Sequence, residues 1–307
     1  MNHPTATSIT AKAWESPKAL PLPRASYAAG VVNGSLVLAG GSYWQNGEKI
    51  RTTAVHLYDL ANQQWSEGRP LPAPLAESAS SSDGHRIYVV GGRHAAGITS
   101  NCLEYYDNCW IPMPDLPEPV TMGALAVANE DLYLLGGLTI ADNWDSATNN
   151  FQLFHANQWT TLPPLPSQGI VTHSTAIWNN ELFCFGGASM KDGVVENTPE
   201  IHSFSMSENH WRKVANLPKP LRALSAAVGP DSIFLFGGYG TTFENNIYKF
   251  NPQTAQIVEI GQLPMGIADC KFFYSAPWWV GAGGEPGPRQ RSHYTWQAKY
   301  NSQPQVP

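Results

Sequence analysis

The sequence has few charged residues and no long apolar segment. Asp, Glu, Lys and Arg make up 14% of its 307 residues, against the roughly 25% that is usual for soluble domains. The formal net charge of -6 leaves no basic surface for nucleic acid, and an acidic surface would repel anionic membranes. No apolar run approaches the ~18 residues of a membrane-spanning helix. Nucleic-acid binding and membrane insertion are therefore not expected.

Cysteine is also scarce. Cys102, Cys109, Cys184 and Cys270 follow none of the spacings of a metal site. Four free thiols are the favoured interpretation, and a disulfide between Cys102 and Cys109 across a short hairpin is the alternative. The first residues, MNHPTATSITAKAW, lack the apolar core of a signal peptide. The sequence thus predicts a cytoplasmic protein with no metal site, and a periplasmic location would require that a signal peptide had been removed.

What the sequence does contain is a sixfold repeat built around pairs of glycines. An apolar run ends in Gly-Gly six times: SLVLAGG, RIYVVGG, DLYLLGG, ELFCFGG, SIFLFGG and WWVGAGG. A tryptophan precedes the first glycine of five pairs by 26 or 27 residues, and Ile257 takes this place before the sixth. A Leu-Pro stretch recurs between them. Spacing this regular indicates a repeat protein.

Each repeat of about 45–51 residues holds four strand-like segments. In the first repeat they are SYAAGVV, SLVLAGG, TAVHLYD and QQWSEG. Four antiparallel strands at this period are typical of a β-propeller blade. Paired glycines suit a crowded strand end, and one tryptophan per repeat suits packing between neighbouring blades. The sequence therefore predicts an all-β protein with the fold of a six-bladed propeller.

The two ends of the chain are expected to close this ring. The segment KAWES reads as an outer strand with no inner strands before it, and SHYTWQAKY reads as a third strand with no fourth after it. Pairing of the two would complete the last blade and remove an open sheet edge. We expect residues 1–300 to form a single propeller and residues 301–307 to form a C-terminal tail.

Polar and aromatic residues are predicted to gather at one mouth of the central channel. Because neighbouring strands run in opposite directions, the start of the innermost strand and the loop after the second strand share one face of each blade. These segments contribute Arg24, Glu77, His173, Asp269, Trp44, Tyr239, Glu285, Arg289 and Arg291. Arg222 stands one residue closer to its glycine pair than Arg24 stands to its own pair. The side chain of Arg222 is therefore expected to point away from this mouth. A concave site with a few polar groups and aromatic walls is typical of a small-molecule pocket.

The segment GGEPGPRQRS is the most distinctive part of this set. Only this glycine pair is followed at once by a glutamate and two arginines, namely Glu285, Arg289 and Arg291. The intervening Pro-Gly-Pro restricts the loop, which suits a preorganised clamp for an anion. An ion pair that only holds the loop in place is the alternative.

The repeats resemble those of Kelch propellers over residues 14–300. Within that group, GGEPGPRQRSHYTW is similar to the G-E-x-x-P-G-x-R-[ST] segment of the bacterial N-acetylneuraminate epimerases, or sialate mutarotases. The resemblance implies a six-bladed enzyme that interconverts the anomers of free sialic acid without a cofactor. It also implies an arginine where Arg24 stands and a histidine where His173 stands. Counting from Glu285 puts the loop arginine of the family at Arg291, whereas matching the Pro-Gly puts it at Arg289.

Anomer exchange opens a hemiketal: one group removes the anomeric proton while another protonates the ring oxygen. The predicted catalytic residues are Glu285, Glu77 and His173. An arginine would hold the sugar carboxylate, and Trp44 or Trp144 would pack on the sugar ring. The predicted substrate-binding residues are Arg24, Arg289, Arg291, Asp269, Trp44 and Tyr239. We therefore expect an isomerase acting on an acidic sugar. A non-catalytic propeller that binds a sugar or a protein partner, and a carbohydrate lyase, are the alternatives.

Overall fold

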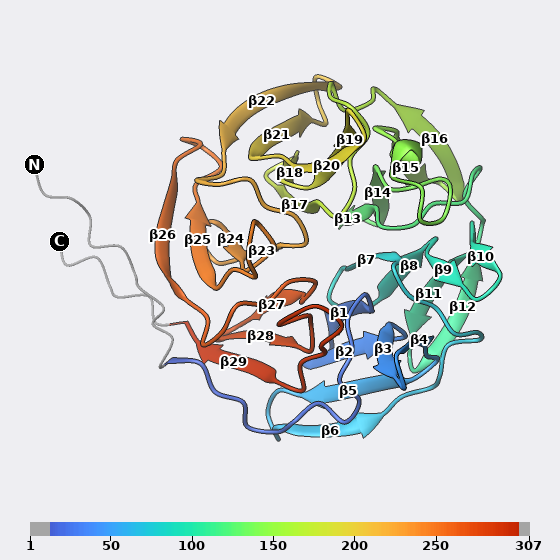
Figure 1. Ribbon diagram of the computed structural model, residues 1–307, viewed down its shortest axis with the longest axis vertical. Coiled ribbons are helices and arrows are strands. Elements are labelled where there is room, and N and C mark those ends of the chain that lie inside the picture. The colour runs from blue at the N-terminus through green and yellow to red at the C-terminus, as the bar shows by residue number, and fades with distance from the viewer. Residues whose placement is uncertain (1–12, 301–307) are drawn as a thin grey trace, which may run out of the picture.

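The computed structural model describes residues 13–300, which form six antiparallel sheets arranged as blades around a central axis (Figure 1). The innermost strand of each blade comes first in the sequence and the outermost comes last. In the first blade these are β1 (Ala28–Val32), β2 (Ser35–Ala39), β5 (Val55–Asp59) and β6 (Gln64–Glu67). They coincide with the four segments expected from the sequence. The predicted six-bladed all-β fold is confirmed.

The other blades repeat this order of strands. The second contains β7 (Ala79–Ser82), β8 (Ile87–Val90), β11 (Cys102–Tyr106) and β12 (Cys109–Met113). The third contains β13 (Ala124–Ala128), β14 (Asp131–Leu135), β15 (Phe151–His155) and β16 (Gln158–Leu162). The fourth contains β17 (Ser174–Trp178), β18 (Glu181–Phe185), β21 (Glu200–Ser205) and β22 (His210–Asn216). The fifth contains β23 (Ser225–Val228), β24 (Ile233–Phe236), β25 (Asn246–Phe250) and β26 (Ile257–Gln262), and the sixth contains β27 (Phe272–Ser275), β28 (Trp278–Ala282) and β29 (Thr295–Lys299).

The loops between the second and third strands carry structure of their own, which the sequence had not predicted. Three of them form small hairpins, β3 (Ser42–Gln45) with β4 (Glu48–Arg51), β9 (Arg93–His94) with β10 (Gly97–Ile98), and β19 (Ala188–Lys191) with β20 (Val194–Asn197). In the third blade the loop contains a short 3-10 helix, η2 (Trp144–Ser146). These loops bring side chains over one mouth of the channel.

The glycine pairs begin these loops, and both glycines of every pair have a positive φ. The close approach of the next blade is a second reason, besides the positive φ, why these positions are glycine. A Cβ on Gly40, whose φ is +64°, would lie 2.4 Å from the carbonyl oxygen of Leu75 in the next blade. Only glycine combines this backbone conformation with such a short distance between neighbouring blades.

The N-terminal segment closes the ring as predicted. Glu15 pairs antiparallel with Gln297 of β29, and the two residues exchange backbone hydrogen bonds of 2.8 and 3.0 Å. Figure 1 shows this segment running beside β29 at the rim of the ring. Next to it, Trp14 packs edge-on against Phe272, with ring centroids 5.5 Å apart. The last sheet therefore gains a fourth, outermost segment from the other end of the chain.

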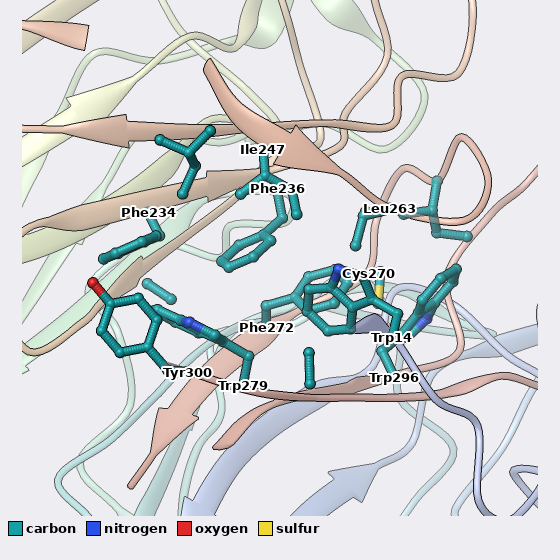
Figure 2. Close-up of a cluster of buried hydrophobic side chains, with 14 residues drawn as sticks. Trp14, Phe234, Phe236, Ile247, Leu263, Cys270, Phe272, Trp279, Trp296 and Tyr300 are labelled. Carbon is teal, nitrogen blue, oxygen red and sulfur yellow. The ribbon is translucent and has the colours of Figure 1, made fainter. Parts of the chain in front are cut away.

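The hydrophobic core is divided into six clusters, and each lies between two neighbouring blades. The cluster between the fifth and sixth blades contains Trp14, Phe236 and Trp279 (Figure 2). The repeated tryptophans of the outer strands also lie at these interfaces, where they are partly buried. The indole N–H of Trp110, for example, donates to the carbonyl oxygen of Arg69 at 2.9 Å, and this carbonyl belongs to the connector from the preceding blade.

The cysteines are free, and three of the four are buried. Cys102 pairs across its hairpin with Met113, and Cys109 pairs with Tyr106, so the two cysteines do not face each other. Within residues 13–300, no helix has the length and apolar character needed to cross a membrane.

Candidate functional site

A cavity of about 800 Å³ opens at the mouth of the channel that the structured loops surround. Its wall comes from the starts of the innermost strands and from the loops between second and third strands. The cavity lining contains four cationic and three carboxylate side chains, which are Lys49, Arg222, Lys271, Arg291, Glu77, Asp269 and Glu285. The chain as a whole carries a formal net charge of -6. The cavity is thus a locally cationic region of an acidic protein.

The rim of the cavity is a ring of six residues, one per blade, that have a positive φ although none is glycine. They are Ser26, Glu77, Met122, Thr172, Ala223 and Asp269, with φ between 51° and 61°. Each stands fourteen residues before the first glycine of its pair. From Glu77 to Asp269, the backbone N–H of each ring residue donates to the carbonyl of the ring residue before it, as from Glu77 to Ser26 at 2.8 Å. Non-glycine residues held in this conformation are concentrated at functional sites.

Glu77 carries one of the two carboxylates on this ring. Its side chain is only 3% exposed, and one carboxylate oxygen forms an ion pair with the ammonium group of Lys49 on β4. The other oxygen, Oε2, is buried and has no hydrogen-bond partner among the described residues. Since buried carboxylate oxygens are normally paired, Oε2 is an acceptor in the cavity wall whose hydrogen-bonding capacity is unused.

Asp269 carries the second ring carboxylate, next to Ser26 on the ring. The hydroxyl of Ser26 donates to Asp269 Oδ2 at 2.6 Å. Burial raises the pKa of Asp269, and the nearby Glu285 charge adds to this effect. Two residues further along, Lys271 donates from Nζ to the hydroxyl of Ser80 at 2.6 Å, and burial lowers the pKa of Lys271 to about 8. Both groups therefore change protonation state closer to neutral pH than ordinary side chains do.

Glu285 and Arg291 lie at the cavity but bind each other. Arg291 Nη1 donates to Glu285 Oε1 at 2.5 Å, and its Nε donates to the carbonyl of Ser42 at 3.0 Å. Arg289 does not line the cavity; its guanidinium stacks over the Trp44 ring at 5.1 Å from the centroid. The contacts of Arg291 favour the loop-holding alternative for this cluster. Whether any of these residues binds a substrate stays a prediction.

Arg24 lies outside the cavity lining, contrary to its expected position, and it is 0% exposed. Its guanidinium bonds to His56 Nδ1 at 2.8 Å and donates to the carbonyl of Leu38 at 3.0 Å. Burial lowers the pKa of Arg24 to about 10, and burial together with the Arg24 charge lowers that of His56 to about 4. The reason is positional: Arg24 precedes the ring residue by two positions, and the equivalent positions are buried and apolar in the other blades, at Leu75, Val120, Ile170, Leu221 and Ile267.

His173, Trp44 and Tyr239 all line the cavity, as expected. His173 is 6% exposed, and burial lowers its pKa to about 3. Its imidazole is therefore neutral at physiological pH. A neutral imidazole can exchange protons only through an unfavourable charged form, so the ring is better suited to shaping the cavity wall than to acid catalysis.

Arg222 was expected to point away, but it lines the cavity. Its guanidinium lies over the ring of Tyr239, with Cζ 4.6 Å from the centroid, and 6.0 Å from the centroid of Trp144. Nη1 donates to Asn197 Oδ1 at 2.8 Å. Among the described residues, no carboxylate lies within ion-pair distance of this arginine.

Three further cavity residues, Ser26, Lys49 and Lys271, were not selected from the sequence. A usable signal was present for Ser26, because it stands at the same distance from its glycine pair as Glu77 does. Lys49 comes from a hairpin that the sequence pattern did not reveal. Lys271 follows Asp269 by two residues, and only the fold shows that both side chains reach one cavity.

The arrangement brings proton acceptors, proton donors and cations to a single concave surface. Within residues 13–300, no group of three or more His, Cys, Asp or Glu side chains is arranged to hold a metal ion. The chemistry that these side chains offer by themselves is proton transfer and anion binding.

Comparisons with known proteins agree with this architecture. Residues 84–273 match the family described as KLHDC2/KLHL20/DRC7 Kelch-repeats domain, and residues 23–72 match the Kelch motif. The chain is 28% identical over 269 residues to Kelch-like protein terF of Aspergillus terreus, which covers 80% of this chain and 57% of that protein. It is 25% identical over 229 residues to beta-scruin of Limulus polyphemus, which covers 70% of this chain and 25% of that protein.

These two curated relatives are longer than the chain, which spans only 25% to 57% of their length. Among solved structures, YjhT aligns with a TM-score of 0.74 at 16% identity, over 90% of this chain and 95% of that one. At this identity the likeness concerns the fold alone. The family match covers more than half of the sequence, and all six blades carry the glycine pairs described above, so the chain belongs to the Kelch-repeat β-propeller family.

Proposed function

We propose that this chain binds a small acidic sugar in the cavity and interconverts its anomers, with N-acetylneuraminate as the first candidate. The observation that carries the proposal is the make-up of the cavity wall. It combines a buried carboxylate oxygen without a partner, a carboxyl group of raised pKa, and more cations than carboxylates. Anomer exchange of a sugar acid needs a proton acceptor, a proton donor and positive charge. The similarity of GGEPGPRQRS to the epimerase segment supports the choice of sugar.

Glu77 is the proposed base. Lys49 binds one of its oxygens, and Oε2, which has no partner among the described residues, accepts the proton of the anomeric hydroxyl. As that proton leaves, the bond between the anomeric carbon and the ring oxygen breaks and a carbonyl forms. The open-chain sugar then rotates about the adjacent bond and closes from the other face, which reverses the proton transfers.

Asp269 is the proposed acid. Because burial raises its pKa, it stays protonated to a higher pH than an ordinary aspartate and can donate to the ring oxygen as that oxygen leaves. The ammonium of Lys271 supplies positive charge nearby. Exchange should therefore slow as the pH rises through the pKa of Asp269, since the donor is then lost.

Proton NMR of freshly dissolved N-acetylneuraminate tests this proposal directly. The protein should shorten the time in which the two anomers reach equilibrium. Glu77→Gln and Asp269→Asn should each slow the catalysed exchange by about 100-fold or more, the usual effect of removing a general acid or base. Asp142→Asn is the matched control, because Asp142 pairs with Arg93 at 2.6 Å outside the cavity lining. A wild-type protein that leaves the exchange at its spontaneous rate would show the proposal to be wrong.

A further inference from the structure

We propose that Arg222 is the residue that binds the carboxylate of the ligand, and that through Arg222 this cavity selects sugar acids over their neutral analogues. The inference rests on the proposed function for the nature of the ligand. It goes further by naming the chemical group that is recognised and the side chain that recognises it. It also differs from the expectation based on the sequence, which gave this role to the charged loop after Gly284.

Three blades hold the Arg222 guanidinium in place. Trp144 comes from the loop of the third blade, Asn197 ends the β19–β20 hairpin of the fourth, and Tyr239 follows the glycine pair of the fifth. Asn197 accepts from Arg222 through Oδ1, and its Nδ2 donates to the carbonyl of Tyr239 at 2.9 Å. The backbones of Arg222 and Tyr239 also exchange hydrogen bonds of 3.0 and 2.7 Å. The guanidinium is thus positioned before any ligand arrives.

The other cations that line the cavity already have polar partners. Lys49 is paired with Glu77, and Arg291 is paired with Glu285. Lys271 donates to the hydroxyl of Ser80. The charges of Lys49 and Arg291 are therefore already compensated by carboxylates, and burial lowers the pKa of Lys271 to about 8. Arg222 has no carboxylate partner and meets only aromatic faces and one amide oxygen among the described residues.

The energetics favour an anion at this position. Burial lowers the pKa of Arg222, which means that its charge is partly removed from water without a counter-charge in return. A partly buried charge without a partner is unfavourable. Asn197 occupies one of the five N–H donors of the guanidinium, so enough donors remain to hold both oxygens of a carboxylate in the parallel geometry that arginine prefers. A carboxylate supplies the missing counter-charge, whereas a neutral sugar does not.

A cycle of two ligands and two proteins tests this inference. The ligands are N-acetylneuraminate and its methyl ester, in which a methyl group on one carboxyl oxygen removes the negative charge. Wild-type protein should bind the acid more tightly than the ester by calorimetry. Arg222→Gln should weaken binding of the acid by about 30-fold or more, because a buried charge contact is lost, and should change binding of the ester by less than about 3-fold. Arg222→Lys should fall between, since it keeps the charge but loses the paired donors.

Arg93→Gln is the matched control. It also removes an arginine from this mouth, but Arg93 is already bound to Asp142 by two contacts of 2.6 Å. It should leave the preference for the acid over the ester in place. Equal affinity of the wild type for acid and ester would overturn the inference, whatever the rate of anomer exchange. A preference that survives in Arg222→Gln would overturn it as well.

A second measurement keeps the test independent of the sugar. In a nitrogen-15 spectrum of the arginine Nε–H groups, titration with pyruvate should shift the Arg222 signal, which is identified by its absence in Arg222→Lys. If pyruvate shifts this signal while the sugar acid neither binds nor exchanges, the carboxylate site stands and the proposed function fails. If neither acid shifts it, the inference about Arg222 fails.

Discussion

Acidification from pH 7 to pH 5 should destabilise this propeller through His173. Its imidazole is buried and neutral, with a pKa of about 3 in the folded chain, whereas an imidazole in an unfolded chain has a pKa near ~6.5. Between these two values the unfolded state binds a proton that the folded state does not. The free energy of unfolding therefore falls as the pH drops below about 6.5, and it continues to fall until the pH approaches the pKa of the folded state.

The size of the effect follows from the difference between the pH and the pKa of the imidazole in the unfolded chain. At pH 5 this difference is about one and a half pH units, and each unit corresponds to about 1.4 kcal/mol. His173 should thus contribute about 2 kcal/mol of lost stability between pH 7 and pH 5. This is a substantial part of the roughly 5–15 kcal/mol by which folded domains are stable.

Urea unfolding followed by tryptophan fluorescence at the two pH values gives the measurement. The His173→Gln variant keeps a neutral polar side chain of similar size and cannot be protonated. Its loss of stability between pH 7 and pH 5 should be smaller than that of the wild type by about 2 kcal/mol. His85→Gln, which changes an exposed imidazole on the opposite face, should lose as much stability as the wild type. If His173→Gln loses as much as the wild type, His173 is not held neutral and the argument is refuted.

Three stability predictions rest on other parts of the fold, each measured by urea unfolding at pH 7. Arg24→Leu should leave the free energy of unfolding unchanged or raise it, because the equivalent positions of the other blades are apolar. This variant should also retain ligand binding, and loss of binding would contradict the position of Arg24 outside the cavity. Trp14→Ala should cost about 3–5 kcal/mol, as for other buried aromatic residues, and a cost below about 1 kcal/mol would argue against closure of the ring by the N-terminal segment. Gly169→Ala should destabilise by at least about 1–3 kcal/mol, since its Cβ would lie 1.8 Å from the carbonyl oxygen of Ala147; an unaffected variant would show that this contact relaxes freely.

The sequence alone was sufficient for the number of blades, their strands and the closure of the ring, but not for the structure of the loops. The spacing of the glycine pairs determined the number of blades, because each pair marks a place where neighbouring blades come too close for a side chain. The alternating apolar segments determined the four strands, and the unpaired segments at the two ends determined how the ring closes. These are local patterns that repeat six times, so an irregularity in one blade does not hide them.

The content of the cavity depended on tertiary structure. Arg24 and Glu77 look equally well placed along the chain, but the ring of positive-φ residues turns Glu77 toward the axis and leaves Arg24 in the apolar interior. The sequence also shows neither that Glu285 and Arg291 bind each other nor that Arg222 lacks an anionic partner. Charge pairing and burial are set by side chains from other blades, and only closure of the ring brings those side chains together.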